Sequence, residues 1–377
     1  MSDALRAGII GTGFMGQVHA RAIKANGHVV DGVASSSRQS AERAATVLGS
    51  GRAYEDAEAL ICSDSIDVIH ICTPNVNHAT LARAALEAGK HVVCEKPLAT
   101  SVEDACQLES LAFSMRRLAS VPFVYRFYPT IREIQNRVAR GVTGPLWMLH
   151  GSYLQDWLAG ADADNWRVDP HSGGASRAFA DIGVHWCDLM EFVTGHRITS
   201  LVAHTARAFS QRQGRDVHTE DGATVMFTTD RHASGSVVIS QVSPGRKNRL
   251  WFSFDGPDAS LSFDQETPDS FWVGGVAQNL TVMRGPDGLG AGAVEYSVVP
   301  PGHPQGYQDA FNGYMKDVYR AAAGETVVGL PTFADGRRAA QITAAVLESS
   351  RRREWVDVPT QPSTNHSHGH LGGSTHD

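Results

Sequence analysis

The amino-acid sequence predicts two domains of different architecture. A doubly wound, mainly parallel α/β sheet is expected over residues 1–125, followed by an α+β domain over residues 126–355 with an open, mainly antiparallel sheet. The length of 377 residues fits two domains. In the first third of the chain, short apolar runs alternate with amphipathic helical stretches, as in βαβ units. Further on, strand-like runs follow one another directly with Gly, Pro and Asp between them, which is typical of an antiparallel sheet.

The first domain is expected to consist of strands joined by helices. We expect strands at residues 6–10, 28–34, 66–71, 91–94 and 118–125. We expect helices between them at residues 16–26, 38–48, 76–88 and 101–115. Gly27, Gly49 and Gly89 follow three of these helices, and glycine is favoured there because it adopts a left-handed backbone without steric cost. Strands that alternate with helices in this way form a parallel sheet covered on both faces.

The second domain is expected to begin with a helix and then to become rich in strands. We expect helices at residues 130–140, 181–193, 307–322 and 333–350. We expect strands at residues 145–153, 198–203, 222–228, 235–241, 249–254 and 259–263. Residues 356–377 are rich in Pro, Ser, Gly and His, so we expect a disordered tail in which His366, His368 and His370 are solvated rather than metal-bound.

The composition argues against several classes of protein. A formal net charge of -7 and the lack of long Lys or Arg runs disfavour a nucleic-acid partner, which needs a basic face. No stretch reaches the roughly 20 apolar residues that span a bilayer, and the N-terminus lacks the basic start of a signal peptide. The five cysteines are scattered singly, as in a reduced compartment. We therefore expect a cytoplasmic protein without membrane contact.

A glycine motif at the first strand-to-helix turn predicts a dinucleotide site. Gly11, Gly13 and Gly16 form the pattern G-x-G-x-x-G, with Phe14 and Met15 inside it. In a Rossmann fold the first glycine permits the tight turn, the second lets the backbone approach a pyrophosphate, and the third lets the helix pack on the strand. The helix N-terminus then offers free N–H groups to the phosphates. The alternative is a glycine-rich turn without a ligand, but its place in a βαβ series favours the cofactor.

The end of the second strand bears on the choice between NAD and NADP. An NAD site usually has a carboxylate there for the ribose hydroxyls. This sequence instead has Ser35, Ser36 and Arg38, and its next carboxylate is Glu42. Hydroxyl groups and an arginine suit a 2′-phosphate, so we expect NAD or NADP with a lean towards NADP. The alternative is that these serines only cap the following helix.

Lys96 lies directly after a predicted strand, in the segment Glu95-Lys96-Pro97. Ligands of open α/β sheets bind at the carboxyl ends of the strands. A lysine at that edge can donate a hydrogen bond to a substrate oxygen, and partial burial would lower its pKa. The alternative for an isolated lysine is an exposed position in a loop.

Asp181 and His185 are four residues apart in a predicted helix, so they project from the same side. Histidine is the side chain best suited to move a proton near neutral pH, and a carboxylate one turn away can orient it or hold a substrate hydroxyl. Two alternatives are a surface ion pair and a metal pair. The pattern supplies too few ligands for a metal, so no metal site is expected.

Together these motifs resemble those of the glucose–fructose oxidoreductase, inositol dehydrogenase and MocA (Gfo/Idh/MocA) family of NAD(P)-dependent oxidoreductases. The resemblance also includes Cys72-Thr-Pro-Asn75 with His78, the segment AGKHVVCEKPLA at residues 88–99, Val124–Pro129, Gly173-Gly174 before Asp181–Asp188, and Pro331–Arg337. It extends from residue 6 to residue 350, which is most of the chain.

The resemblance implies the residues of the site. The family's catalytic Lys, Asp and His match Lys96, Asp181 and His185. Cofactor contacts are expected from Gly11, Gly13, Phe14, Met15, Gly16, Ser35, Ser36, Arg38, Thr73, Pro74, Asn75, His78, Glu95, Lys96 and Arg126. The resemblance also implies a homodimer or homotetramer, because family members commonly associate through the outer face of the open sheet.

Aromatic and amide side chains lie between the strand expected at residues 145–153 and the helix expected at residues 181–193. They suggest a carbohydrate substrate, because sugar ring faces stack on aromatic rings and sugar hydroxyls need polar partners. Substrate contacts are expected from Lys96, Tyr125, Gln155, Trp157, Trp166, Arg167, Asp181, His185 and His303. The alternative is that Trp157 and Trp166 pack in the domain core. The segment YLQDW at residues 153–157 resembles the branch of the family that includes levoglucosan and glycoside dehydrogenases.

The implied reaction is hydride transfer between a nicotinamide and a secondary alcohol or ketone of a sugar, glycoside or cyclic polyol, such as C3 of a glucoside. In this scheme Lys96 hydrogen-bonds the reacting oxygen, His185 is the base, and Asp181 orients His185 or a neighbouring hydroxyl. Lys96 and His185 both remain candidates for the proton acceptor. The alternatives are an inositol or polyol dehydrogenase, an aldose or imine reductase, and a redox-cycling glycosidase. A cofactor-sensing regulator is disfavoured because the chain retains Lys96 and His185.

Overall fold

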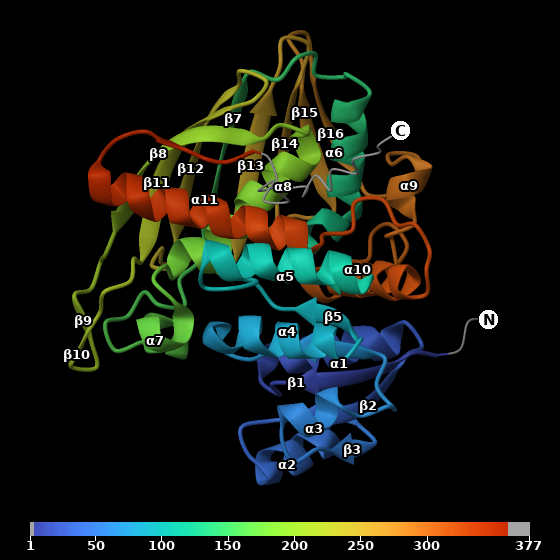
Figure 1. Ribbon diagram of the computed structural model, residues 1–377. Coiled ribbons are helices and arrows are strands. Elements are labelled where there is room, and N and C mark those ends of the chain that lie inside the picture. The colour runs from blue at the N-terminus through green and yellow to red at the C-terminus, as the bar shows by residue number, and fades with distance from the viewer. Residues whose placement is uncertain (1–3, 361–377) are drawn as a thin grey trace, which may run out of the picture.

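The first domain is built on a six-stranded, all-parallel sheet with the strand order β3-β2-β1-β4-β5-β6. The computed structural model describes residues 4–360 (Figure 1). The strands are β1 (Arg6–Ile10), β2 (Val29–Ala34), β3 (Arg52–Ala53), β4 (Val68–Ile71), β5 (His91–Cys94) and β6 (Ala119–Ser120). Between them run α1 (Phe14–Ala25), α2 (Arg38–Leu48), α3 (Ala57–Ile61), α4 (His78–Glu87) and α5 (Val102–Met115). This is the doubly wound order, and the order in which strands are added reverses between β1 and β4, where such sheets bind ligands.

The second domain is built on a nine-stranded sheet with the order β16-β15-β14-β13-β7-β12-β11-β8-β17. Its strands are β7 (Met148–Leu154), β8 (Ile198–Ala206), β11 (Gly222–Thr229), β12 (Ser234–Ser240), β13 (Arg249–Asp255), β14 (Ser260–Asp264), β15 (Ser270–Gly274), β16 (Asn279–Met283) and β17 (Val356–Asp357). Neighbouring strands are antiparallel except β7 and β12, which are parallel. A separate hairpin joins β9 (Gln211–Arg212) and β10 (Arg215–Asp216). The predicted fold class is therefore confirmed for both domains.

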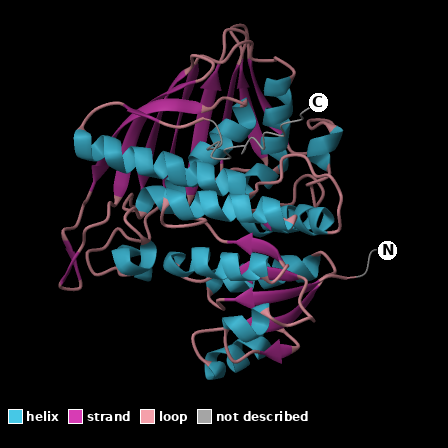
Figure 2. Ribbon diagram, in the orientation of Figure 1, coloured by secondary structure: helices cyan, strands magenta, loops and turns pink. Residues whose placement is uncertain are grey.

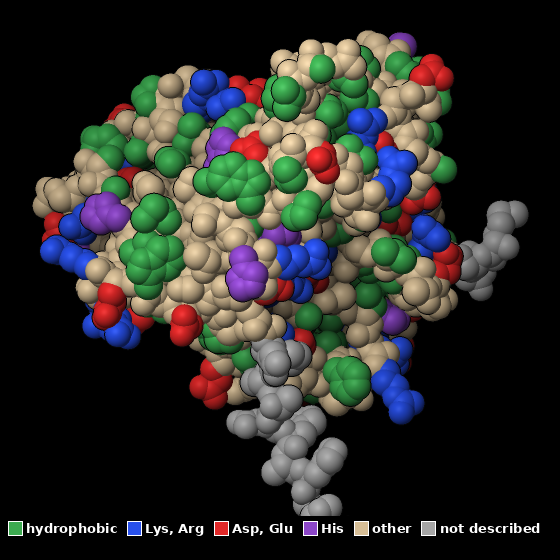
Figure 3. All heavy atoms as spheres, turned by 90° about the horizontal axis from the view of Figure 1, so that it is seen from above, with side chains coloured by type: hydrophobic (Ala, Val, Ile, Leu, Met, Phe, Trp, Pro, Cys, Tyr) green, Lys and Arg blue, Asp and Glu red, His purple; other side chains and the backbone are tan. Residues whose placement is uncertain are grey.

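Helices cover one face of this large sheet (Figures 1 and 2). They include α6 (Pro129–Ala139), α8 (Val184–Thr194) and α11 (Phe333–Arg352), with the short α9 (Ala291–Val294) beside α6. Inward and outward residues alternate along β12, which is the pattern of a strand with one face on a core. Seen from above, exposed hydrophobic side chains lie in several separate groups among charged ones (Figure 3). Within residues 4–360, no helix is long and apolar enough to cross a bilayer.

The C-terminal helices return to the first domain. Helix α10 (Tyr307–Ala322) packs against α1, where the Asn26 side chain donates a 3.0 Å hydrogen bond to the carbonyl of Asn312. Helix α11 lies along α5, and Arg337 of α11 forms an ion pair with Glu109 of α5. A β-bridge also joins Ser120 to Thr332. Segments that are distant in sequence therefore join the two domains.

Some predicted element boundaries are wrong. The strand expected at residues 118–125 stops at Ser120, because Pro122 has no N–H for a ladder, and the chain continues as the 3₁₀ turn η2 (Val124–Phe127). Helix α3 and the strands β15 and β16 were also not predicted. Most of β16 is exposed, so its apolar pattern is weak. The expected tail begins too early, because β17 pairs with β8 and Val358 is buried. The histidines of the tail lie outside the described residues.

Candidate active site

A cleft of about 1300 Å³ lies between the two domains. Its first side is formed at the carboxyl ends of β1, β2, β4 and β5, where Gly11, Ser35, Cys72 and Glu95 line it. The opposite side is formed by β7 and the start of α8, together with the loops around them. The cleft therefore occupies the switch point of the parallel sheet, which is the expected place for a nucleotide in this architecture.

The three glycines of the motif have different roles. A Cβ on Gly11, whose φ is +92°, would lie 2.5 Å from the carbonyl oxygen of Cys72, and one on Gly16 would lie 2.4 Å from that of Gly11. Both positions therefore need glycine because a side chain would collide with the backbone. Gly16 does not line the cleft, so the structure does not place it where a direct cofactor contact was predicted. A Cβ on Gly13 would meet no atom of the described chain within 4 Å, yet Gly13 lines the cleft. Its missing side chain therefore leaves room for a ligand.

The N-terminus of α1 suits an anion. Gly13 is its N-cap residue, provides no side-chain cap, and is followed by no acidic residue in the first turn. The free N–H groups and the positive end of the helix dipole therefore face the cleft, where Phe14 and Met15 also lie. With the space beside Gly13, this geometry fits the pyrophosphate of a dinucleotide.

At the end of β2, two of the three predicted ribose contacts line the cleft and the third does not. Ser35 and Ser36 line the cleft, and Ser35 shares a 3.1 Å hydrogen bond with Thr12. Arg38 does not line it: its side chain is 58% exposed and pairs with Glu42 at 2.8 Å, because the two lie one turn apart on α2. The expected contact from Arg38 is therefore absent from the described cleft.

His78 links the two loops that carry the next predicted cofactor residues. Its Nδ1 lies 2.7 Å from the carbonyl oxygen of Pro97 and its Nε2 lies 3.0 Å from that of Thr73. Asn75 donates a 2.8 Å hydrogen bond to the carbonyl of Gly173 in the second domain. The cleft is lined by Thr73, Pro74, Asn75, His78, Glu95 and Lys96.

Lys96 and Asp181 meet at the floor of the cleft. Lys96 Nζ donates to Asp181 Oδ1 at 2.6 Å and to the Asp181 carbonyl oxygen at 2.7 Å. Gln241 Nε2 donates to the other carboxylate oxygen at 2.7 Å, and Arg167 Nε lies 3.4 Å from Oδ1. Burial by itself would raise the pKa of Asp181, but Lys96 and Arg167 outweigh it and hold that pKa well below its usual range. Asp181 is therefore ionised at neutral pH.

His185 lies in the first turn of α8 and lines the same cleft. It is 7% exposed, its ring packs edge-on against Tyr125 with centroids 5.3 Å apart, and its Nδ1 has no hydrogen-bond partner among residues 4–360. Burial and then the charge of Lys96 hold the pKa of His185 well below 6.5, although Asp181 opposes them. The imidazole is therefore neutral near pH 7 and can accept a proton.

Asp181 and His185 both line the cleft, but no hydrogen bond joins them among residues 4–360, so of the two roles predicted for Asp181 the structure does not show it orienting the histidine. Residues 179–183 form the π-helical turn η4, and α8 begins only at Val184. This wider turn changes the four-residue spacing that brings side chains together in an α-helix. Asp181 consequently bonds to Lys96 and Gln241, and His185 reaches the cleft independently.

A polar network closes the substrate end of the cleft. The hydroxyls of Tyr125 and Tyr153 lie 2.5 Å apart, and Tyr153 donates to Asn248 Oδ1 at 2.8 Å. Asn248 donates to Tyr125 at 3.0 Å and accepts from Gln155 Nε2 at 2.7 Å. Gln155 also accepts a 2.7 Å hydrogen bond from Trp157 Nε1. These linked groups present amide and hydroxyl functions beside aromatic rings, as a sugar site requires.

Both predicted tryptophans lie at the cleft rather than in the core. Trp157 is 37% exposed and lines the cleft. Trp166 also lines it, and the Arg167 guanidinium lies 4.4 Å from its ring centroid. The alternative that these rings only fill the domain core is therefore wrong.

Comparison with known proteins identifies the family. Residues 5–123 match the "Oxidoreductase family, NAD-binding Rossmann fold", and residues 131–262 match the "GFO/IDH/MocA C-terminal domain". The chain belongs to the Gfo/Idh/MocA family. It is thus an oxidoreductase with an NAD-binding Rossmann domain.

Three relatives illustrate the similarity. A levoglucosan dehydrogenase of Pseudarthrobacter phenanthrenivorans is 30% identical over 94% of this chain and 98% of that protein. A glucose-6-phosphate 3-dehydrogenase of Bacillus subtilis is 23% identical over 94% of this chain and 98% of that protein. A solved structure of levoglucosan dehydrogenase with NADH and levoglucosan has a TM-score of 0.89 and 30% identity, covering 95% of this chain and 100% of that one.

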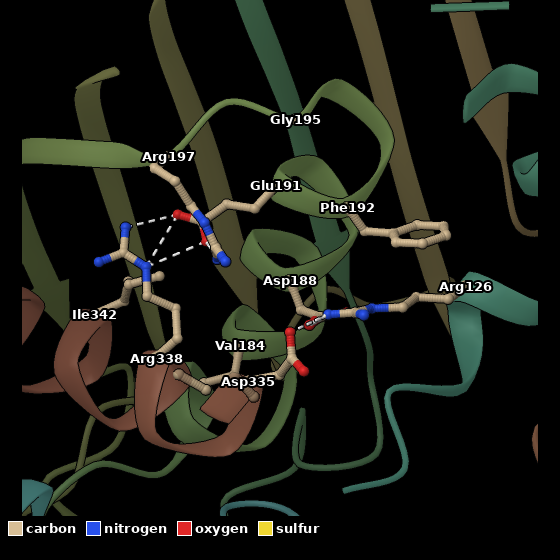
Figure 4. Close-up of a pocket in the computed structure, with 11 residues that line it drawn as sticks. Arg126, Val184, Asp188, Glu191, Phe192, Gly195, Arg197, Asp335, Arg338 and Ile342 are labelled. Carbon is tan, nitrogen blue, oxygen red and sulfur yellow. Dashed lines mark hydrogen bonds and ion pairs between the residues drawn. The ribbon is translucent and has the colours of Figure 1, made fainter. Parts of the chain in front are cut away.

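Arg126 of this Gfo/Idh/MocA protein is not placed as predicted. It points away from the cleft into a separate hollow of about 330 Å³ between α8 and α11 (Figure 4). Its Nε donates to Asp188 at 2.8 Å and its Nη2 to Asp335 at 2.7 Å. Two carboxylates therefore hold the guanidinium, and the cofactor contact expected from Arg126 is wrong.

The charges of this hollow are paired with one another. Arg338 and Arg197 both bind Glu191, at 2.6 Å and 2.5 Å (Figure 4). Burial raises the pKa of Asp188 to about 7, against the lowering effect of Arg126. The charged groups of the hollow therefore form an ion-pair network.

His303 is also wrongly predicted. It is exposed in the loop before α10, its carbonyl accepts a 2.6 Å hydrogen bond from Arg284, and it does not line the cleft. Conversely, sequence reasoning missed Gln241, Asn248, Tyr153 and Tyr307. Tyr153 belongs to the quoted segment YLQDW, but the other three stand in no recognisable motif. Among residues 4–360 no cluster of His, Cys, Asp or Glu is arranged to hold a metal.

Proposed function

We propose that this oxidoreductase transfers hydride between a nicotinamide cofactor and a secondary alcohol of a neutral sugar or glycoside ring, with C3 of a glucoside as the favoured position. One observation carries the proposal: a buried, neutral His185 and the Lys96–Asp181 pair share the cleft with the open face of Gly13. The levoglucosan and glucose-6-phosphate dehydrogenases among the relatives support a carbohydrate substrate.

The residues of the cleft have different roles in the proposed reaction. Gly13, the N-terminus of α1 and Ser35 would hold the cofactor, which when bound supplies the hydride acceptor. Lys96 has one Nζ hydrogen left beyond its two bonds to Asp181, and it donates that hydrogen to the reacting oxygen. Neutral His185 takes the hydroxyl proton as the carbon loses hydride. Asp181, held on its other oxygen by Gln241, keeps Lys96 charged and in place.

The remaining lining groups favour an uncharged ring. Trp157 and Trp166 offer faces for stacking, and Gln155 and Asn248 offer amide groups for hydroxyls. The nearby cations are neutralised locally, because Arg167 faces Asp181 and Lys247 pairs with Asp156 at 2.7 Å. A sugar phosphate would have to compete with these carboxylates, so we favour a neutral glycoside.

We further propose that NADP is preferred to NAD. The chain has no carboxylate between the end of β2 and Glu42, so a 2′-phosphate beside Ser35 and Ser36 would not meet a carboxylate from this segment. Arg38 lies in the first turn of α2 on an exposed and therefore weak ion pair with Glu42. It exchanges that partner for the phosphate when NADP binds.

An oligomer is proposed on separate grounds. The strands β11, β12, β15 and β16 expose Met226, Val238, Trp272, Leu280 and Met283. A face of this kind suits association of two copies of the chain. Light scattering on the wild type and on Trp272→Glu tests this, since the substitution should lower the observed mass if the face is an interface.

The function is tested by following absorbance of the reduced nicotinamide with glucose, glucosides, levoglucosan and inositols, each with NAD and NADP. Reduced cofactor that accumulates in proportion to oxidised sugar supports the proposal. Sugar cleavage without net cofactor reduction would identify a redox-cycling glycosidase instead. Tight cofactor binding with no turnover in either direction would identify a cofactor-sensing protein.

A further inference from the structure

The loop at residues 156–168 carries both tryptophans that line the cleft, and we call it the tryptophan loop. Trp157 lies at its start, and Trp166 begins the 3₁₀ turn η3 (Trp166–Val168) at its end. Between the two rings the chain forms no helix and no strand. An irregular segment of this kind has no ladder of its own for its carbonyl groups, so its course depends on side chains from elsewhere.

Arg212 of the hairpin β9–β10 supplies these hydrogen bonds. Its Nη1 donates to the carbonyl oxygens of Gly160 at 2.6 Å and Ala163 at 3.1 Å, and its Nη2 donates to that of Leu158 at 2.8 Å. Nη2 also donates to Asp221 Oδ1 at 2.9 Å. Arg212 is 1% exposed and does not line the cleft. All four hydrogens of its terminal nitrogens are therefore used, and three of them hold the chain between the two tryptophans.

The buried apolar side chains of the tryptophan loop belong to neither of the two main hydrophobic cores. Leu158 and Val168 instead form a small cluster with Val217, which directly follows β10. At the surface, Arg215 of the hairpin also forms an ion pair with Asp164 of the loop. The hairpin projects from the lower edge of the large sheet in Figure 1. The loop therefore packs against the hairpin rather than into a domain core, and Arg212 is the main polar link between them.

One carboxylate, that of Asp221, joins the tryptophan loop to the catalytic turn η4. It accepts from Arg212 and from Arg177, whose Nη2 also donates to the carbonyl of Glu220 at 2.9 Å. The Oε1 atom of Glu220 accepts a 3.0 Å hydrogen bond from the N–H of the first residue of η4. The loop with the two tryptophans and the turn with Asp181 are therefore fixed to a common anchor beside β11.

Asp221 does not need Arg212 as its counter-ion. Burial alone would raise the pKa of Asp221, but the hydrogen bond and charge of Arg177, followed by the hydrogen bond from Arg212, outweigh burial and lower that pKa. Arg177 is 2% exposed and binds the same carboxylate oxygen, so Asp221 keeps a cation when Arg212 is replaced. The contacts that Arg212 alone provides are therefore those with the tryptophan loop.

We propose that Arg212 is a positioning residue for the sugar: it fixes Trp157 and Trp166 in the cleft and so sets the affinity for the sugar ring, without touching substrate or cofactor. The inference rests on the proposed function, because the two rings contact a substrate only if the cleft binds a sugar. A loop that is already ordered does not have to be ordered when the ligand binds. Without Arg212 the sugar must order the loop itself, so its affinity falls while the reacting groups remain in place.

The first test compares Arg212→Met with Arg284→Met. Arg284 is a buried arginine of the same kind: it is 3% exposed, pairs with Asp269, and donates to the carbonyls of Val299 at 2.7 Å and His303 at 2.6 Å, none of which lines the cleft. We expect Arg212→Met to raise the sugar KM about tenfold, the scale of one lost aromatic contact, with kcat within about twofold and the cofactor Kd unchanged. Arg284→Met should lower stability but leave all three constants unchanged. Equal sugar KM values in the two folded variants would overturn the proposal.

A second variant covers the case in which Arg212→Met does not fold. Arg212→Lys keeps a cation beside Asp221, but a single ammonium has three hydrogens and cannot serve the same four acceptors as the planar fork. We expect its sugar KM to rise in the same direction. A folded Arg212→Lys protein with the sugar KM and the loop dynamics of the wild type would also overturn the proposal.

The last test needs no substrate and so separates the role of Arg212 from the proposed function. The loop contains hydrogen-bonded amides at Leu158, Ala163 and Val168. Hydrogen–deuterium exchange across residues 157–168 should be faster in Arg212→Met than in the wild type, and unchanged in Arg284→Met. Unchanged exchange in Arg212→Met, or faster exchange with a wild-type sugar KM, would refute the positioning role even if sugar oxidation were confirmed. Faster exchange in a protein that oxidises no sugar would retain the loop contacts and refute the proposed function.

Discussion

Two acid–base clusters share the helical segment that runs through η4 and α8, and they differ in almost every physical respect. Asp181 faces the cleft, where it binds Lys96 and Gln241. Asp188 faces the opposite way and is locked with Arg126 and Asp335 behind α8 (Figure 4). The pKa of Asp181 is held well below its usual range, whereas burial raises that of Asp188 to about 7.

An ion pair beside a pocket is therefore not by itself evidence of a functional site. In the rear cluster the donors of Arg126 are taken up by two carboxylates. In the cleft, Lys96 has one Nζ hydrogen beyond its two bonds to Asp181, and His185 Nδ1 has no hydrogen-bond partner within residues 4–360. The cleft cluster is therefore available for chemistry, and the rear cluster stabilises the packing of α8 against α11.

The largest effect is expected from Lys96→Ala. It removes the hydrogen bond to the reacting oxygen, so turnover should fall by at least about a hundredfold, the scale of a positioned acid–base group. Cofactor affinity, measured by fluorescence titration, should remain within a few-fold because the glycine turn is untouched. Near wild-type turnover would exclude Lys96 from the reaction.

Arg126→Met tests the rear cluster. The substitution keeps the volume but leaves Asp188 and Asp335 without their cation, so unfolding free energy should fall by about 3–5 kcal/mol, as when one partner of a buried pair is removed. Denaturant unfolding measures this loss. Turnover per folded molecule should stay near wild type, and a specific loss of kcat in the folded fraction would place Arg126 in the active site after all.

A smaller effect, on the pKa of His185, tests whether this residue is the base. Its pKa lies well below 6.5 because of burial and the charge of Lys96, so the imidazole is the neutral base throughout the neutral range. The acid limb of kcat/KM for alcohol oxidation should therefore appear well below pH 6.5. In Lys96→Gln, the loss of the positive charge should raise the His185 pKa, which an NMR titration would detect. An unchanged or lower pKa would contradict the proposed coupling.

The smallest effect is expected at the exposed pair of Arg38 and Glu42. Arg38→Ala should weaken NADP about fivefold and NAD hardly at all, because a solvated charge contributes roughly 1 kcal/mol. Glu42→Gln is the matched control: it frees Arg38 and should strengthen NADP. Binding titrations with both cofactors decide the matter, and equal effects of Arg38→Ala on NAD and NADP would remove Arg38 from the 2′-phosphate contact.

Much of the site was predictable from the sequence because its determinants are local. Gly11 and Gly16 are required by the geometry of a single strand-to-helix turn, and that turn lies within six residues. Lys96 follows a strand whose neighbours form a parallel sheet, so its place at the binding edge follows from topology alone. His185 was predicted through its motif, whereas the bond between Asp181 and Lys96 was not predicted.

Short-range periodicity and backbone sterics predict the doubly wound domain and its glycine turn from the amino-acid sequence, whereas Lys96, Asp181 and His185 became candidate catalytic residues through their resemblance to the family's motifs. How these residues come together depends on the tertiary structure. It brought Lys96 to Asp181 across 85 residues and Tyr319 to His70 across 249, and it turned Arg126 away from the cleft. Such contacts depend on which helix faces which sheet and on where buried charges find partners, and no local pattern in the chain records either.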